Sequence, residues 1–318
     1  MRVLITGVTG FVGPYVAAEV ARTKPGAEIY GLVWTPPDPE TTRLLPEDLR
    51  TLQGDITDSD SLLAVLDACR PDMVLHLAAS SSGAAAWERP VECFEVNAIG
   101  TLKLLEAVRQ LGLSPTVVVA SSGEIYGSAE DESHPLKEDS PYRPISPYAA
   151  SKAAQDLIAD QFCRAHGTPI IRLRLFNHTG PRRPPVFAAS SFARQIVEIE
   201  RGIRQPRLEV GNLEARRDFV DVRDAARAYW LAATRGTPGA AYNVCSGRAS
   251  SIRDILDLLL EAADCTVEVV PDPARMRPAD IPLLIGDPSR IEEATGWRPE
   301  ISLDQTLFDL LEWWRSQP

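Results

Sequence analysis

Short apolar runs alternate with amphipathic stretches along the first half of the chain. Six of these runs have the length and flanking turn residues of buried strands, and apolar residues between them recur at helical spacing. The predicted strands are residues 2–6, 27–34, 49–58, 71–79, 114–127 and 168–177, and the clearest predicted helices follow at 13–22, 97–110 and 147–165. Strands and helices that alternate in this order predict an α/β fold of the Rossmann type, with a doubly wound parallel sheet.

The pattern changes after residue 177. A loop rich in turn formers follows, and then helices, short strands and a Pro-rich tail in mixed order. We therefore predict a nucleotide-binding domain over 1–177, to which residues from about 218 to 245 return. A smaller mixed α/β lid over 178–217 and 246–318 is expected to bind the substrate. Within it, Arg217 and Arg277 are candidates for a diphosphate, because a guanidinium matches that geometry, although either alone could be a solvated surface residue.

Composition excludes several classes of function. The 318 residues carry a net charge of −11, which argues against a broad nucleic-acid surface. No apolar run reaches membrane length, and Thr and Gly interrupt the N-terminal run that superficially resembles a signal peptide. The five cysteines are scattered and the four histidines lack metal-ligand spacing. We expect a cytoplasmic protein with reduced thiols, no metal site, no membrane contact and no nucleic-acid partner.

A glycine-rich turn follows the first predicted strand. Gly7, Gly10 and Gly13 are spaced as in a dinucleotide fingerprint, with a strand before them and a helix after them. The glycines permit a tight turn, close approach of backbone to a pyrophosphate, and packing of helix on strand. The helix start adds free N–H groups. The alternative is a glycine-rich turn that binds nothing.

Residues at the ends of the next strands are expected to contact the rest of such a cofactor. The second strand ends at Trp34 with neither an acid nor an Arg, and the missing acid favours NADP weakly while leaving NAD open. Asp55 and Ile56 are placed to touch the adenine, although Asp55 could instead cap a helix. A buried core role with hydrogen-bonded ring nitrogens fits His76 better than a catalytic role. Asn97 is a helix cap or fixes nearby backbone.

Chemistry is expected from residues after the fifth strand and from the helix that starts near residue 147. Ser122 and Glu124 follow the strand, where ligands of parallel sheets sit, although serines there also serve turns. Tyr148 and Lys152 are four residues apart and share one face of the helix. A nearby ammonium lowers the pKa of a phenol, so the pair is a possible proton relay. In isolation, the same spacing also fits a packed Tyr beside a solvated Lys.

Taken together, the glycine turn, SSGE at 121–124 and YAASK at 148–152 resemble the extended short-chain dehydrogenase/reductases over essentially the whole chain. The second half, with RLFNHTGPRR, NLEARRDFVDVRD and YNVCSG, is similar to the GDP-mannose branch of that family. The resemblance implies a GDP-sugar substrate, a bound NADP (NAD being possible), and a homodimer formed through a four-helix interface of residues 97–110 and 147–165.

The resemblance also implies roles for individual residues. The implied catalytic residues are Ser122, Tyr148 and Lys152. The implied cofactor-binding residues are Gly7, Gly10, Phe11, Val12, Gly13, Trp34, Asp55, Ile56, Leu77, Ala78, Ala79, Asn97, Tyr148 and Lys152. The implied substrate-binding residues are Ser122, Glu124, Asn177, Arg194, Arg217 and Arg277.

One position separates the two activities of this branch. Its dehydratases carry an acid beside the Glu after the fifth strand, whereas this chain has Gly123 before Glu124. Elimination needs both an acid and a base, and carbonyl reduction does not. The resemblance therefore implies a reductase that converts GDP-4-dehydro-6-deoxy-D-mannose to GDP-6-deoxy-D-mannose (GDP-D-rhamnose). A 4,6-dehydratase or 4-epimerase of the same family is the alternative, and a non-catalytic dinucleotide-binding regulator is a remote one.

Overall fold

A seven-stranded sheet forms the centre of the molecule. The computed structural model describes residues 1–276 and 279–318. Every neighbouring pair in the sheet is parallel, and the strand order is β10-β6-β5-β4-β1-β2-β3. The strands are β1 (Arg2–Thr6), β2 (Glu28–Val33), β3 (Arg50–Gln53), β4 (Met73–His76), β5 (Thr116–Ser122), β6 (Ile170–Leu175) and β10 (Ala241–Val244). This order confirms the predicted doubly wound Rossmann-type sheet.

The central strands are buried on both faces, which explains their continuous apolar sequences. Except for β1, which matches its predicted run, these strands are shorter than the apolar runs predicted. The third ends at Gln53, because the Asp55 carboxylate accepts hydrogen bonds from the Thr57 amide and hydroxyl and closes a turn. The fifth ends at Ser122, where a short 3-10 helix, η2 (Gly123–Tyr126), begins.

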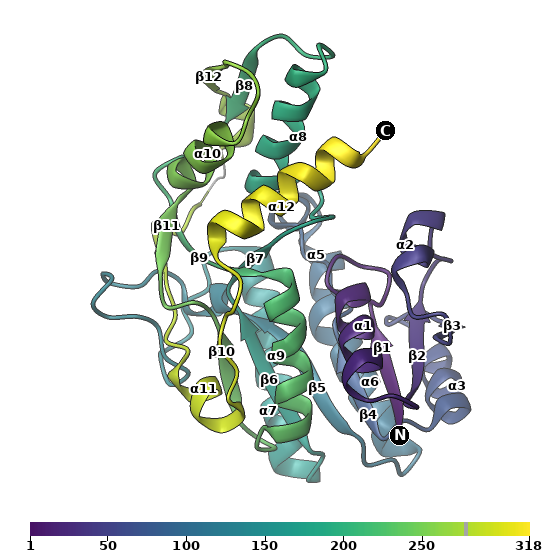
Figure 1. Ribbon diagram of the computed structural model, residues 1–318. Helices are drawn as coiled ribbons and strands as arrows, with labels where there is room; N and C mark the ends of the chain where they lie inside the picture. The colour runs from purple at the N-terminus through teal and green to yellow at the C-terminus, as the bar shows by residue number, and fades with distance from the viewer. Residues whose placement is uncertain (277–278) are drawn as a thin grey trace.

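Helices cover the two faces of this sheet (Figure 1). One face carries α1 (Gly13–Thr23) and α9 (Val222–Arg235), and the other carries α3 (Ser59–Cys69), α6 (Gly100–Gln110) and α7 (Pro147–His166). Between β4 and α6, the chain forms α4 (Gly83–Glu88), α5 (Pro90–Phe94) and the π-helical turn η1 (Glu95–Ile99), and α2 (Pro39–Leu44) follows β2. Each face buries its own apolar cluster against the sheet.

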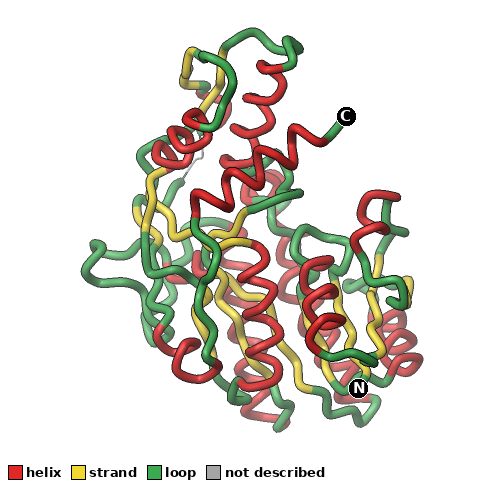
Figure 2. Tube along the Cα trace, viewed as in Figure 1, coloured by secondary structure: helices red, strands yellow, loops and turns green. Residues whose placement is uncertain are grey.

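A second, smaller layer of structure lies above the carboxyl ends of the strands (Figure 2). Its apolar core is formed by one face each of α8 (Ala188–Glu200), α10 (Ile252–Glu261) and α12 (Leu303–Ser316). Its remaining strands are β7 (Asn177–Thr179), β8 (Arg207–Val210), β9 (Arg216–Asp221), β11 (Ala249–Ser251), β12 (Glu268–Pro271) and β13 (Leu283–Leu284). We call this layer the lid.

The chain crosses between the sheet and the lid more than once. After the first lid segments it returns to the sheet as α9 and β10. The tail also returns, which the sequence analysis did not predict. Ile291 in α11 (Ser289–Thr295) and Trp297 are fully buried in the core beside α9, and the Trp297 indole donates a hydrogen bond to the Asp224 carbonyl at 2.9 Å.

None of the helices in the described part of the chain is both long enough and apolar enough to cross a membrane.

Candidate functional site

A cavity of about 690 Å³ lies between the carboxyl ends of the strands and the lid. It opens where the strand order reverses, beyond β1 and β4, which is the usual ligand crevice of an open parallel sheet. Its floor is formed by residues 7–13 after β1, 77–79 after β4 and 120–122 of β5. Residues of β7, α8 and β9 close it from the lid side.

The glycine turn forms a tight backbone cradle at one end of this cavity. Gly7 has φ +71°, and a Cβ there would lie 2.8 Å from the Ala78 nitrogen. A Cβ at Gly13 would lie 2.4 Å from the carbonyl oxygens of Gly7 and Val8. No side chain caps the start of α1, which leaves its first N–H groups directed at the cavity. The cradle fits the pyrophosphate of a dinucleotide.

Orphaned polar atoms support the same conclusion. In the described ranges, Ser121 Oγ, Thr179 Oγ1 and Arg182 Nη1 are the buried side-chain polar atoms without a hydrogen-bond partner. Ser121 and Thr179 both line the cavity, one from the sheet and one from the lid. Buried polar groups of this kind are costly unless something satisfies them, so the cavity is suited to a polar ligand.

Helix α7 brings Tyr148 to Ser122. The Ser146 hydroxyl caps the helix by accepting from the Ala149 amide at 3.1 Å, and Pro147 occupies the first turn, as predicted. Tyr148 therefore projects into the cavity one turn before Lys152. The Ser122 hydroxyl is hydrogen-bonded to the Tyr148 phenol, and it also accepts from the Glu124 amide at 3.1 Å.

The predicted lowering of the Tyr148 pKa is wrong for this structure. Burial raises the pKa of the phenol well above its usual value, and the Glu124 carboxylate raises it further, while the Ser122 hydrogen bond opposes them. The Lys152 side chain directs its hydrogen bonds to other groups. It donates to the Ala120 carbonyl at 2.5 Å and to Gln155 Oε1 at 2.7 Å. Burial lowers the pKa of Lys152 itself to about 7.

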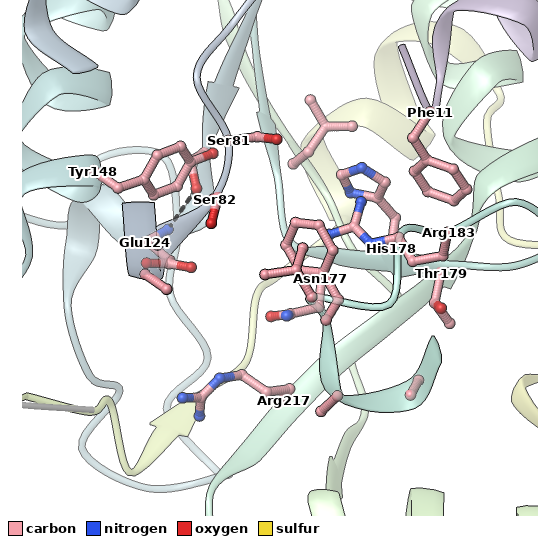
Figure 3. A pocket seen from close by; sticks show the side chains of 18 of the residues that line it. Phe11, Ser81, Ser82, Glu124, Tyr148, Asn177, His178, Thr179, Arg183 and Arg217 are labelled. Carbon is pink, nitrogen blue, oxygen red and sulfur yellow. Dashed lines mark hydrogen bonds between the residues drawn. The ribbon is translucent and has the colours of Figure 1, made fainter. Parts of the chain in front are cut away.

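The lid supplies the opposite wall, where positive charge gathers. Figure 3 shows Tyr148 and Glu124 on one side of the cavity, and His178 and Arg183 on the other. Arg217, which is buried, also lines the cavity and donates to Asp280 Oδ1 at 2.6 Å and to the Ile281 carbonyl.

Sequence reasoning missed Arg183 and His178. The Arg183 guanidinium carbon lies 3.4 Å from the ring centroid of Phe187 and 4.8 Å from that of Phe11. His178 stacks on Phe11 with ring centroids 5.9 Å apart, and burial lowers its pKa to about 3. Burial also lowers the pKa of Arg183 to about 9. Their place directly after the sixth strand, in the polar loop HTGPRRPP, was the available signal.

Most of the predicted site residues line this one cavity. They are Gly7, Gly10, Phe11, Val12, Gly13, Leu77, Ala78, Ala79, Ser122, Glu124, Tyr148, Lys152, Asn177 and Arg217. The sequence therefore identified both walls of the cavity, from segments as far apart as the glycine turn and β9.

Other predicted residues lie outside the cavity lining. Trp34 is 73% exposed at the end of β2, and Ile56 is buried at the end of the β3 turn, so their cofactor roles, and that of Asp55, stay predictions. Asn97 is fully buried and holds the cavity wall indirectly, since its side chain bonds both the amide and the carbonyl of Ser80. Arg194 is half-exposed and pairs with Glu198 on α8. Arg277 lies outside the described residues.

Comparisons with known proteins agree with this geometry. The family model described as GDP-mannose 4,6 dehydratase matches residues 4–310. The GDP-6-deoxy-D-mannose reductase of Pseudomonas aeruginosa is 36% identical over 99% of this chain and 98% of its own length.

Solved structures resemble the whole chain as well. The structure of RMD from Pseudomonas aeruginosa complexed with NADPH is 34% identical, with a TM-score of 0.86 over 99% of each chain. The Thermus thermophilus UDP-glucose 4-epimerase complex with NAD is 31% identical, with a TM-score of 0.88 over 99% of each chain. On the match of its family model and the identity to its relatives, the chain belongs to the GDP-mannose 4,6-dehydratase family, within the extended short-chain dehydrogenase/reductases.

Proposed function

We propose that this protein reduces the C4 carbonyl of GDP-4-dehydro-6-deoxy-D-mannose to give GDP-6-deoxy-D-mannose, with NADPH as the preferred cofactor and NADH as a possible one. The 36% identity to a GDP-6-deoxy-D-mannose reductase over nearly the whole chain supports the substrate. The NADPH in the Pseudomonas aeruginosa RMD structure supports the cofactor.

One observation about the cavity favours reduction over dehydration. Glu124 lines the cavity together with Tyr148 and Ser122, and the position before it is Gly123, which has no side chain that could act as an acid. A Cβ at Gly123 would lie 2.8 Å from ring carbons of Phe176, so the backbone here is packed against an aromatic ring. Elimination of water requires an acid and a base that act together, whereas carbonyl reduction needs one proton donor and a hydride.

The position of Tyr148 in the cavity, beside Ser122 and Lys152, suits a proton donor. Its phenol is protonated at neutral pH, so it can deliver a proton to the substrate O4 as negative charge develops there. Ser122, bonded to the same phenol, orients the carbonyl oxygen. Lys152, anchored on Ala120 and Gln155, lines the same cavity and adds positive charge to the site in its protonated form.

The cofactor fits the cradle formed by residues 7–13 and 77–79. When bound, NADPH supplies the hydride. The backbone N–H groups at the start of α1 would hold its pyrophosphate, and Lys152 would hold the ribose next to the nicotinamide. On the lid side, Asn177, Arg217 and Arg183 are our candidates for the sugar and the diphosphate of the substrate. Glu124 would accept a hydrogen bond from a sugar hydroxyl.

A direct assay tests the proposal. The purified protein is mixed with the 4-keto GDP sugar and NADPH, then NADH, and cofactor oxidation is followed at 340 nm. The product is identified by NMR. We expect stoichiometric NADPH oxidation and GDP-6-deoxy-D-mannose. Turnover of GDP-mannose without added reductant would instead identify a dehydratase, and interconversion of C4 epimers without net oxidation would identify an epimerase.

We also infer a homodimer formed through the face that carries α5, η1, α6 and α7. Apolar side chains gather there in the open: Val91 is 70% exposed and Leu157 57% exposed, with Phe94 and Ile99 also exposed. Contiguous apolar surface of this kind marks an interface. A cytoplasmic location is proposed on separate grounds, because all five cysteines are unpaired.

A further inference from the structure

A continuous chain of buried hydrogen bonds leads away from Lys152, under the site and across the sheet. Lys152 Nζ donates to Gln155 Oε1 at 2.7 Å, and Gln155 Nε2 donates to the Thr101 hydroxyl on α6 at 2.7 Å. All three side chains are buried, with exposures of 2% or less. The first half of this hydrogen-bond chain therefore links α7 to α6.

The second half leads from α6 to the wall of the cofactor cradle. The Thr101 hydroxyl lies 2.9 Å from Nε2 of His76 on β4, and His76 Nδ1 lies 2.7 Å from the Thr6 hydroxyl on β1. The Ala78 amide donates to the Thr6 hydroxyl at 3.1 Å. Because both Lys152 and Ala78 line the cavity, the hydrogen-bond chain starts and ends at the site.

One placement of the protons satisfies every donor and acceptor in the hydrogen-bond chain. The Ala78 amide can only donate, so the Thr6 hydroxyl must give its own proton to His76 Nδ1, or that proton has no partner in the chain. His76 is then neutral, with its proton on Nε2, and donates to Thr101. Thr101 accepts from His76 and Gln155 and donates to the Asn97 carbonyl at 2.7 Å. Burial keeps His76 neutral by lowering its pKa to about 3.

We propose that His76, Thr101 and Gln155 are positioning residues for the reduction, which lock the Lys152 ammonium in register with the Gly7–Ala78 wall of the cofactor cradle. The inference depends on the proposed function for the identity of the reaction. Two of the three N–H donors of Lys152 are held by Ala120 and Gln155, so the direction of the third, toward the cavity, is fixed by the chain.

This arrangement gives His76 a role that packing alone does not require. An apolar side chain would fill the same space in β4, but it would leave Thr6 and Thr101 with buried, unpaired groups. A fixed direction of the ammonium reduces the reorganisation needed when the proton leaves Tyr148, and small misplacements at such a centre can cost large factors in rate.

Thr101→Val tests the chain at its middle, since Val keeps the shape of Thr and removes the hydroxyl. Thr295→Val is the matched control. Thr295 is also a buried helical threonine, and its hydroxyl donates to the Ile291 carbonyl and accepts from the Trp297 amide, far from the cavity. Thr101→Ser restores the hydroxyl. Each variant is measured for kcat, for KM of both substrates, and for its unfolding midpoint in urea.

We expect Thr101→Val to lose kcat by on the order of tenfold or more, with a much smaller change in KM for the GDP sugar. Thr101→Ser should regain most of the kcat. Thr295→Val should lose comparable stability and keep the wild-type kcat. Equal kcat values for Thr101→Val and Thr295→Val would overturn the proposal, and so would a Thr101→Ser variant as slow as Thr101→Val.

A second measurement is made on the wild-type protein and so does not depend on how a variant folds. ¹⁵N NMR of the histidine-labelled protein should show His76 as the Nε2–H tautomer, unchanged between pH 5.5 and 8. The opposite tautomer, or a titrating His76, would contradict the chain. If the wild type fails to reduce the 4-keto GDP sugar, the proposed function fails, and the NMR result still decides whether the chain exists as described.

Discussion

At the scale of single residues, burial changes the acid–base properties of Tyr148 and Lys152, which the sequence presents as a simple pair. Tyr148 and Lys152 are neighbours on one helical face, which suggested that the ammonium lowers the pKa of the phenol. In the structure, Lys152 turns to Ala120 and Gln155, and burial dominates both pKa values, raising that of Tyr148 and lowering that of Lys152. The phenol is protonated at neutral pH, which is the form that a reductase uses.

Replacement of Tyr148 by Phe should remove this acid without disturbing the cradle. We expect kcat to fall by about 10²- to 10⁴-fold, because general acid catalysis contributes factors of that size. NADPH binding, measured by fluorescence titration, should stay near the wild-type value. Tyr30→Phe is the control, since it removes a phenol hydroxyl that bonds Glu28, remote from the cavity. Near-normal turnover of Tyr148→Phe would exclude the proposed role.

A methyl group at Gly123 should not be tolerated. Its carbon would lie 2.8 Å from the Phe176 ring, so Gly123→Ala should lower the free energy of unfolding by about 1–3 kcal/mol, as overpacking does elsewhere. Urea titration measures the change. The double variant Gly123→Ala/Phe176→Leu should be less destabilised than the sum of the two single changes. Strict additivity would show that the ring does not limit this position.

At the scale of secondary-structure elements, hydrogen bonds hold α7 to α6, to β6 and to the loop that carries Tyr142. Beyond Lys152, its buried Asp156 accepts hydrogen bonds from Arg174 Nε at 3.0 Å and Arg172 Nη1 at 3.2 Å on β6. The Tyr142 hydroxyl donates to the same carboxylate at 2.7 Å. Since loss of one partner leaves a buried charge uncompensated, the network fixes the rotation of the helix that presents Tyr148.

His76, which ties β4 to β1 and α6, should make the fold sensitive to acid. Its pKa is about 3 in the folded protein and about 6.5 in the unfolded chain, so the unfolded state binds more protons and stability falls as pH drops below 6.5. Between pH 7.5 and 5.5 this residue should account for on the order of 1 kcal/mol of lost stability.

Urea unfolding of wild type and His76→Gln at both pH values measures that contribution. The variant is expected to be less stable at pH 7.5, because it loses bonds to Thr6 and Thr101, but its loss on acidification should be smaller than that of the wild type. The same pH-dependence in both proteins would show that His76 is not the group responsible.

At the scale of the whole molecule, the lid and the sheet form a cavity that neither builds alone. Gly7 and Tyr148 come from the sheet layer, whereas Arg183 and Arg217 come from the lid. The proposed dimer face lies on the sheet layer, on α5, η1, α6 and α7, and its exposed apolar residues are not part of the lining of the cavity. Association and ligand binding can therefore be tested separately.

Leu157→Arg places a charge on that face. We expect the variant to elute as a monomer in size-exclusion chromatography with light scattering, because a buried unpaired charge opposes association, while NADPH binding is retained. Ile203→Arg is the control: Ile203 is equally apolar and 72% exposed, but follows α8 in the lid, so this variant should stay dimeric. A monomeric wild type would refute the proposed dimer.

The sequence by itself determined the alternation of strands and helices, the glycine turn, and the placing of Tyr148 and Lys152 on one face of a helix. These are local signals, carried by periodicity, turn chemistry and spacing along one helix. The family motifs added the lid residue Asn177, which the structure brings to the cavity.

Only the tertiary structure decided which partners the long side chains contact and which polar groups are buried away from water. Arg194 pairs along its own helix instead of reaching the cavity, and Arg183 enters it between Phe11 and Phe187. Nothing in the sequence links Lys152 through Gln155 and Thr101 to His76, because these residues come from three elements that meet only when the sheet is assembled. Burial, and with it the pKa values, depends on all the layers together, so it could not be predicted from local pattern.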